Sequence, residues 1–240
     1  MIFYYIRHGD PIYNPDSLTP LGERQAEAVG RRLCSLGIKK IYSSTSQRAK
    51  MTATPLAQMM KVDITDLDFA NESHAWAELT SIGGDGVKRW IQVDPELAPV
   101  LITEEVRQMG DSWFEHPKFC DNPSYKKGIE RIARSTDDLL RSLGYEHDRA
   151  TKTYRSIAPS DEKVALFAHA GFGAAFLSCL LDIPFPEFSV RFDMTHTGVT
   201  AIEFVRIYND IYVPKVLFYS DMSHIFASDL PMRYNNGKYV

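Results

Sequence analysis

Two histidines in this chain each follow a short apolar run that ends abruptly. His8 stands in the tripeptide Arg7-His8-Gly9, directly after MIFYYI, and His169 comes directly after residues 164–168. A neutral imidazole, whose ordinary pKa is about 6.5, is a competent nucleophile. A guanidinium beside His8 disfavours protonation of its ring by like-charge repulsion, which leaves a nitrogen lone pair available for attack.

A second arginine suggests what such a nucleophile would attack. Arg48 follows a run of four hydroxyl side chains, residues 43–46, at the predicted start of a helix. The planar guanidinium fork matches phosphate oxygens, and helix N-termini add N–H donors and partial positive charge. Two imidazoles, Arg7 and Arg48 together suit a tetrahedral dianion, and the two guanidiniums would spread the charge that develops during phosphoryl transfer.

The elements that must position these groups follow an alternating pattern. Thr19-Pro20 predicts a helix cap followed by the first helical residue, and Gly37 predicts the end of that helix. Apolar runs predict buried strands, and three- and four-residue apolar steps predict helices. The predicted strands cover residues 1–6, 40–42, 64–69, 164–168, 200–205 and 211–218, and the predicted helices cover 20–36, 48–60, 125–143 and 172–181.

This strand–helix alternation predicts an α/β fold with a mostly parallel central sheet flanked by helices. Ligands of such sheets bind at the carboxyl ends of the strands. We therefore expect His8 and His169 to meet at one edge, although they lie far apart in the sequence.

Two stretches break the pattern. Residues 74–123 contain Trp76, Trp90 and Trp113 among prolines and charges, and we interpret them as a mainly helical, cap-like insertion over the active-site end of the sheet. Residues 144–162 are polar and are predicted to form a loop. We expect residues 1–240 to form a single domain.

Composition excludes several classes of function. The 240 residues carry a net charge of -4, unlike the basic surplus of nucleic-acid binders, and 44% are hydrophobic, enough for a sizeable core. No stretch approaches the roughly 20 apolar residues of a membrane span. The three cysteines form no CxxC pair, which indicates neither a disulfide framework nor a zinc site and favours a cytoplasmic location.

Taken singly, Arg7-His8-Gly9 would also fit an ordinary strand end. The ordered set of motifs, however, resembles the histidine phosphatase superfamily, also called phosphoglycerate-mutase-like. The similarity covers about the first 70 residues and residues 163–205. It lies in Arg7-His8-Gly9, Asn14, Leu18-Thr19-Pro20-Leu21-Gly22, Tyr42-Ser43-Ser44 leading to Arg48, His169, and Thr197-Gly198-Val199-Thr200.

The resemblance implies a role for each matching position. His8 resembles the nucleophile that becomes phosphohistidine, and His169 resembles a second catalytic group of the pocket. The phosphate-binding positions implied in the same way are Arg7, Asn14, Arg48 and, more remotely, His196. The resemblance implies neither a metal nor a cofactor.

The proton donor for the leaving group is expected in the segment after Arg48. Counting forward from Arg48 gives Glu72, counting back from Trp76 gives Ala70, and Glu78 is a rival. A donor at neutral pH needs a pKa above the ordinary value of about 4.3, which a nearby phosphate charge would produce. Of the three, we favour Glu72.

Three functions are compatible with these residues. The first is a phosphomonoesterase that hydrolyses a small phosphate ester through phosphohistidine and releases inorganic phosphate. The second is a phosphoglycerate mutase, although Asp10-Pro11 after the tripeptide is unlike the mutases. The third is a catalytically silent binder of phosphorylated ligands on the same fold. Neither the substrate nor the oligomeric state can be read from the sequence, which gives no sign of nucleic-acid or membrane partners.

Overall fold

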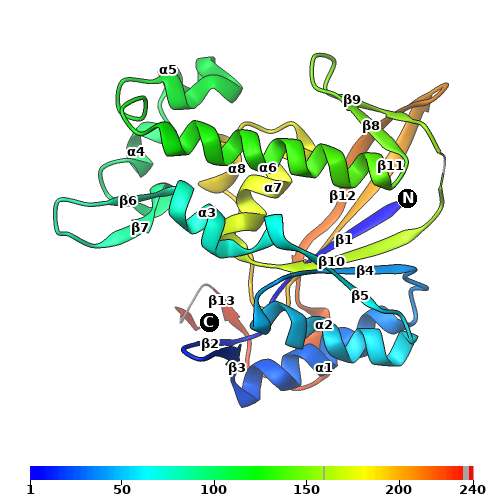
Figure 1. Ribbon diagram of the computed structural model, residues 1–240. Helices are drawn as coiled ribbons and strands as arrows, with labels where there is room; N and C mark the ends of the chain where they lie inside the picture. The colour runs from blue at the N-terminus through cyan, green and yellow to red at the C-terminus, as the bar shows by residue number, and fades with distance from the viewer. Residues whose placement is uncertain (159, 235–237, 240) are drawn as a thin grey trace.

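The molecule is built around one eight-stranded sheet, seen in a computed structural model that describes residues 1–158, 160–234 and 238–239 (Figure 1). The strand order across the sheet is β5 (Ile64–Leu67), β4 (Lys40–Ser44), β10 (Lys163–Ala168), β1 (Ile2–Arg7), β11 (Val199–Tyr208), β12 (Ile211–Asp221), β9 (Thr153–Ser156) and β8 (Tyr145–Asp148). The first four are mutually parallel, and each later pair is antiparallel. The predicted α/β class with helices flanking a central sheet is confirmed.

Helices cover both faces of the sheet (Figure 1). One face carries α1 (Pro20–Cys34) and α2 (Gln47–Met60), with α9 (Ser223–Ala227) against α1. The other face carries α3 (Glu72–Glu78), α6 (Pro123–Ser142), α7 (Ala170–Leu181) and α8 (Phe185–Ser189). The central strands are therefore apolar on both sides.

Strand β1 shows this double burial residue by residue. Phe3 and Tyr5 belong to the core beneath α6 and α7, whereas Tyr4 and Ile6 belong to the core beneath α1 and α2. Successive side chains of a strand point to opposite faces, so an unbroken apolar run is what a strand buried on both faces requires. The same run delivers His8 to the end of a rigid central strand.

The helix cap predicted at Thr19 is present, and the second long helix of this face also begins with a side-chain cap. The Thr19 side chain accepts a hydrogen bond from the Gly22 N–H at the start of α1, which begins at Pro20. Ser46 caps α2 in the same way by accepting from the Ala49 N–H. Both caps satisfy N–H groups that have no partner within their helix.

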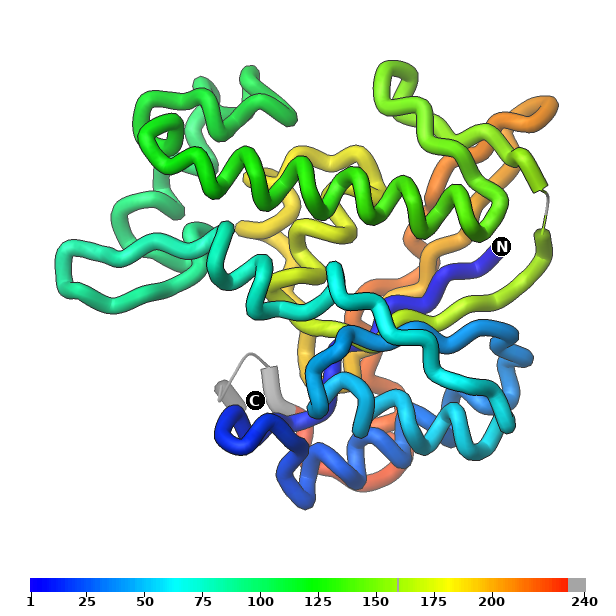
Figure 2. The backbone as a smooth tube through the Cα atoms, in the orientation of Figure 1, coloured from blue at the N-terminus to red at the C-terminus, as the bar shows by residue number. Residues whose placement is uncertain are grey.

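The stretch predicted as a polar loop is wrong in one respect, because it contains the hairpin β8–β9 at the edge of the sheet. The hairpin lies beside the β11–β12 turn (Figure 2). Within it the buried His147 ring donates to Asp137 at 2.8 Å and to Asp182 at 2.8 Å. The ring also stacks on Tyr154, with centroids 4.1 Å apart.

The segment after α3 is helical only in part. A hairpin of β6 (Thr80–Ile82) and β7 (Lys88–Trp90) projects from the body (Figure 2), a feature that the prediction of a mainly helical segment lacked. The rest contains α4 (Ala98–Leu101), α5 (Glu104–Met109) and short 3-10 turns at Ile91–Val93 and Gly110–Glu115.

Three small elements complete the description. Hairpin β2 (Pro11–Tyr13) and β3 (Asp16–Leu18) follows β1, β13 (Arg233–Tyr234) pairs with β14 (Lys238–Tyr239), and a 3-10 turn at Asp68–Ala70 precedes α3. In the described part of the chain, no helix is long and apolar enough to cross a bilayer.

Candidate active site

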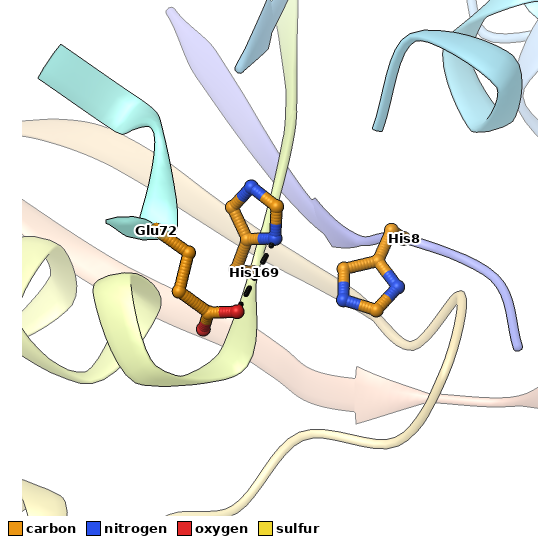
Figure 3. A group of neighbouring side chains, drawn as sticks. All are labelled: His8, Glu72 and His169. Carbon is orange, nitrogen blue, oxygen red and sulfur yellow. Dashed lines mark ion pairs between the residues drawn. The ribbon is translucent and has the colours of Figure 1, made fainter. Parts of the chain in front are cut away.

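The two histidines meet at the carboxyl edge of the parallel strands, as their positions in the sequence predicted. Strands β1 and β10 pair with Arg7 opposite Ala168, and the His8 N–H donates to the Ala168 carbonyl at 2.9 Å. Both imidazoles are buried, and their ring centroids lie 5.1 Å apart with planes at 61°. Figure 3 shows the two rings and the Glu72 carboxylate turned toward one another.

His8 is held as a neutral ring with one free lone pair. Its Nδ1 lies 2.7 Å from the Gly9 carbonyl oxygen, which can only accept, so Nδ1 carries the proton and Nε2 does not. Burial, together with the adjacent His169 and Arg7, holds the pKa of His8 well below its usual value. The ring therefore has the tautomer and charge of a nucleophile at neutral pH.

Gly9 is glycine because the chain packs backbone against backbone here. A Cβ on Gly9 would lie 2.7 Å from the Gly22 carbonyl oxygen, and a Cβ on Gly22 would lie 2.2 Å from the Asp10 carbonyl oxygen. Two glycines of the sequence motifs thus allow the end of β1 to touch the first turn of α1.

His169 is oriented by hydroxyl groups on one side and by a guanidinium on the other. Its Nε2 lies 2.8 Å from Ser44 Oγ and 3.2 Å from Ser46 Oγ, and its Nδ1 accepts from Arg48 at 3.1 Å. Since Arg48 can only donate, Nδ1 is unprotonated and Nε2 donates to the serines. Burial and then Arg48 hold the pKa of His169 well below its usual value.

The backbone of His169 is fixed by Tyr5. The buried phenol donates to the His169 carbonyl at 2.6 Å and accepts from the His169 N–H at 3.2 Å. This contact crosses from β1 to the start of α7 and was not foreseen from the sequence. The available signal was a tyrosine in a strand predicted to be buried, because a fully buried phenol usually has a hydrogen-bond partner.

The two guanidiniums lie at the same edge of the sheet. Arg7 is 4% exposed and donates to the Met194 carbonyl. Arg48 donates through Nη1 to Asp16 at 2.8 Å and through Nη2 to Glu72 at 3.2 Å. Asp16 is a site residue that sequence reasoning missed, since nothing in the sequence separates it from other polar turn residues.

Glu72 lies beside the histidines, whereas the alternative proton donor Glu78 does not. Its Oε1 accepts from the Gly171 N–H at 3.0 Å, and its Oε2 lies 3.5 Å from His169 Nδ1. Glu78 instead forms a two-oxygen pair with Arg131 of α6, at 3.0 and 2.7 Å. Of the two glutamates considered from the sequence, Glu72 is therefore the one that lies beside the histidines.

The remaining two predicted phosphate contacts differ in placement. His196 is 7% exposed, and its ring centroid lies 5.6 Å from that of His8, so it lies beside the expected nucleophile. Asn14 lies in the exposed turn between β2 and β3, and the structure does not bring it to the pocket. Its hairpin neighbours Tyr13 and Asp16 line the cavity instead.

A cavity of about 780 Å³ opens over these groups. Its walls combine the polar groups described above with aromatic side chains from the segment after Glu72. Its lining includes Arg7, Arg48 and Glu72, and also Trp76, Trp90 and Gly171. An anionic group with an organic substituent fits such a cavity.

The same groups raise the question of a metal ion. One ligand atom each from His8, Glu72 and His169 lie within 4.8 Å of one another (Figure 3). However, Arg48 Nη2 lies 3.2 Å from the Glu72 carboxylate and 3.1 Å from His169 Nδ1, so a cation there would face a fixed positive charge. The electrostatics of the cluster favour an anion.

The N-terminal part of the chain, which carries both arginines and the first histidine, is similar to the histidine phosphatase superfamily. Residues 3–82 match the family model described as histidine phosphatase superfamily (branch 1). A relative from Salmonella arizonae, described as probable phosphoglycerate mutase GpmB, is 42% identical over 71 residues. That segment is 26% of this chain, and it spans only 33% of the relative's length.

Solved structures resemble nearly the whole chain. A mycobacterial glucosyl-3-phosphoglycerate phosphatase in complex with VO3 covers 92% of this chain and 99% of its own, with a TM-score of 0.57 at 18% identity. A phosphoserine phosphatase from Entamoeba histolytica, in complex with 3-phosphoglyceric acid, covers 93% and 98%, with a TM-score of 0.56 at 17% identity. At these identities, the likeness establishes the shared fold.

Proposed function

We propose that this protein is a phosphomonoesterase that hydrolyses a small phosphate ester through a phosphohistidine at His8. The observation that carries the proposal is the neutral His8 ring, with Nε2 unprotonated, beside Arg7 and Arg48, which line the cavity at this edge of the sheet. An uncharged nucleophile beside two guanidiniums is suited to a phosphoryl dianion, because the charges that bind the substrate also keep the ring unprotonated.

In the first step, His8 Nε2 forms a bond to phosphorus while the bond from phosphorus to the leaving oxygen breaks. Arg7 and Arg48 stabilise the charge on the three transferring oxygens. Glu72 gives its proton to the leaving alkoxide. The phosphoryl group competes with the Glu72 carboxylate for Arg48, so a bound substrate loosens the ion pair that holds Glu72 in place.

In the second step, a water molecule attacks the phosphohistidine. Glu72, now a carboxylate, accepts the proton from the water, and the bond from phosphorus to Nε2 breaks. Inorganic phosphate leaves and His8 is regenerated as the neutral ring. The carbonyl of Gly9 keeps Nδ1 protonated throughout, so that Nε2 is the reacting nitrogen in both directions.

The test is replacement of the nucleophile. We expect His8→Ala to abolish release of phosphate from p-nitrophenyl phosphate and to abolish acid-labile labelling of the enzyme by phosphate. His74→Ala is the matched control, because the His74 side chain is 44% exposed and pairs with Asp68 outside the pocket. Full activity in His8→Ala, with circular dichroism unchanged in both variants, would contradict the mechanism.

A mutase is the second candidate, and it is favoured by the likeness to GpmB in the N-terminal segment. Both reactions share the first step and differ in what accepts the phosphoryl group. Incubation with 3-phosphoglycerate separates them, because a phosphatase releases inorganic phosphate whereas a mutase forms an isomer.

A further inference from the structure

A second cavity adjoins the proposed phosphate pocket. Its volume is about 580 Å³, and it shares Arg7, Trp90, Ala170 and Gly171 with the first cavity. The shared residues include Arg7, which the proposed mechanism places on the phosphoryl group. A substrate whose phosphoryl group contacts Arg7 can therefore extend its leaving group into the second cavity.

Trp90 forms the wall between the two cavities. It is the last residue of β7, its ring packs edge-on against Trp76 with centroids 5.0 Å apart, and it lies close against Gly171. A Cβ on Gly171 would lie 2.2 Å from Trp90 Cζ2, so only glycine permits this approach. The hairpin that the sequence did not predict thus shapes the leaving-group side of the site.

The second cavity offers little to a negatively charged leaving group. Apart from Arg7, its only cationic residue in the described part of the chain is Arg191, and Asp193 lines the same wall. Arg191 also donates to the Glu187 carbonyl at 3.0 Å. In the first cavity, Arg7 and Arg48 are the cations, and the proposed function commits both to the phosphoryl group.

Two polar side chains of the second cavity have unmet hydrogen-bonding capacity. Gln92 Oε1 and Ser189 Oγ are buried oxygens without a hydrogen-bond partner among the described residues. A buried polar atom without a partner is costly, whereas a hydroxyl group can both donate and accept. A small rotation of either side chain toward a hydroxylated ligand would satisfy it.

We infer that the leaving group of the substrate is an uncharged, hydroxylated alcohol that extends past Trp90 into the second cavity. The inference rests on the proposed phosphomonoesterase activity and narrows its substrate class. The inference predicts a higher kcat/KM for polyol or sugar phosphates than for phosphorylated acids.

The experiment compares two six-carbon substrates that differ at one end. Sorbitol 6-phosphate and 6-phosphogluconate carry a CH2OH group and a carboxylate, respectively, at the carbon farthest from the phosphate. We expect kcat/KM for sorbitol 6-phosphate to exceed that for 6-phosphogluconate at least tenfold. A ratio of one or less would overturn the inference.

Two variants at Gln92 test whether the second cavity makes this distinction. We expect Gln92→Leu to lower kcat/KM for sorbitol 6-phosphate relative to p-nitrophenyl phosphate, and Gln92→Arg to raise the relative kcat/KM for 6-phosphogluconate by supplying a cation. An unchanged substrate ratio in both variants would show that the second cavity is not where the leaving group lies.

Failure of the inference is separable from failure of the proposed function. If the wild-type protein hydrolyses p-nitrophenyl phosphate but prefers the acid, only the leaving-group inference falls. If it hydrolyses none of the three esters, the phosphomonoesterase proposal falls and the inference falls with it.

Discussion

Removing a single hydroxyl by Tyr5→Phe should reveal how strongly the fold supports His169. The Tyr5 phenol is fully buried and makes two hydrogen bonds to the His169 backbone, at 2.6 and 3.2 Å. The His169 carbonyl keeps a second donor, the Gly173 N–H at 3.0 Å, but the His169 N–H loses its acceptor. Loss of the donated bond costs about 0.5–1.5 kcal/mol, and the orphaned N–H costs about 1–3 kcal/mol.

We therefore expect Tyr5→Phe to lower the free energy of unfolding by about 1.5–4.5 kcal/mol, measured by urea denaturation. We also expect kcat to fall about tenfold or more, because small displacements of a positioned group are expensive. Tyr4→Phe is the matched control. Tyr4 is the preceding residue of β1, packs into the opposite core, and has a hydroxyl with no hydrogen bond in the described part of the chain. Equal effects of the two substitutions would refute the role assigned to Tyr5.

Three further outcomes are expected. Glu72→Gln should slow the hydrolysis of alkyl phosphates by roughly 10²- to 10⁴-fold but that of aryl phosphates much less, since only a poor leaving group needs the proton. Equal slowing of both in steady-state assays would show that Glu72 is not the proton donor. Burial by itself lowers the pKa of His147, but the hydrogen bonds to its two aspartate partners outweigh the effect of burial, so the pKa is raised. The contribution of His147 to stability should therefore be full below about pH 6.5 and be lost as the pH rises through the raised pKa. The difference in unfolding free energy between wild type and His147→Gln should accordingly shrink on going from pH 6 to alkaline pH; a constant difference would contradict this. Gly22→Ala should lower the free energy of unfolding, measured by urea denaturation, by about 1–3 kcal/mol or more, because its Cβ would lie 2.2 Å from the Asp10 carbonyl oxygen. The control Gly84→Ala should be nearly neutral, because its Cβ meets only the flexible Glu96 carboxylate at 3.3 Å. Similar losses of stability in the two variants would show that the backbone at Gly22 adjusts to the added methyl group.

The sequence was informative where one physical requirement dominated. Strands β1 and β10 are buried on both faces, so their apolar runs are unbroken and the polar residues His8 and His169 mark their ends. Thr19 was recognisable because a helix start needs a short polar cap. The convergence of the two histidines then followed from the direction of parallel strands.

The failures lie where several requirements compete. Strand β8 is an edge strand that carries His147 and Asp148, and such charged residues are common at sheet edges because they oppose aggregation. That polarity made the hairpin look like a loop.

The site's tertiary contacts were the least predictable. Trp90 acts through a close approach to Gly171, and the two residues are far apart in the sequence. No local pattern encodes such a contact, since it depends on how a hairpin from the middle of the chain lies over the start of α7.

The place of β1 in the sheet has a consequence for synthesis of the protein. β1 is made before both of the strands that flank it, which begin only at Lys163 and Val199. While the chain is being synthesised, this six-residue strand has neither of its sheet partners. Long-range strand pairings of this kind form slowly, and the exposed apolar strand makes the nascent chain prone to aggregation. A translation product interrupted before Lys163 would therefore expose the apolar side chains of β1, which makes such a fragment prone to aggregate.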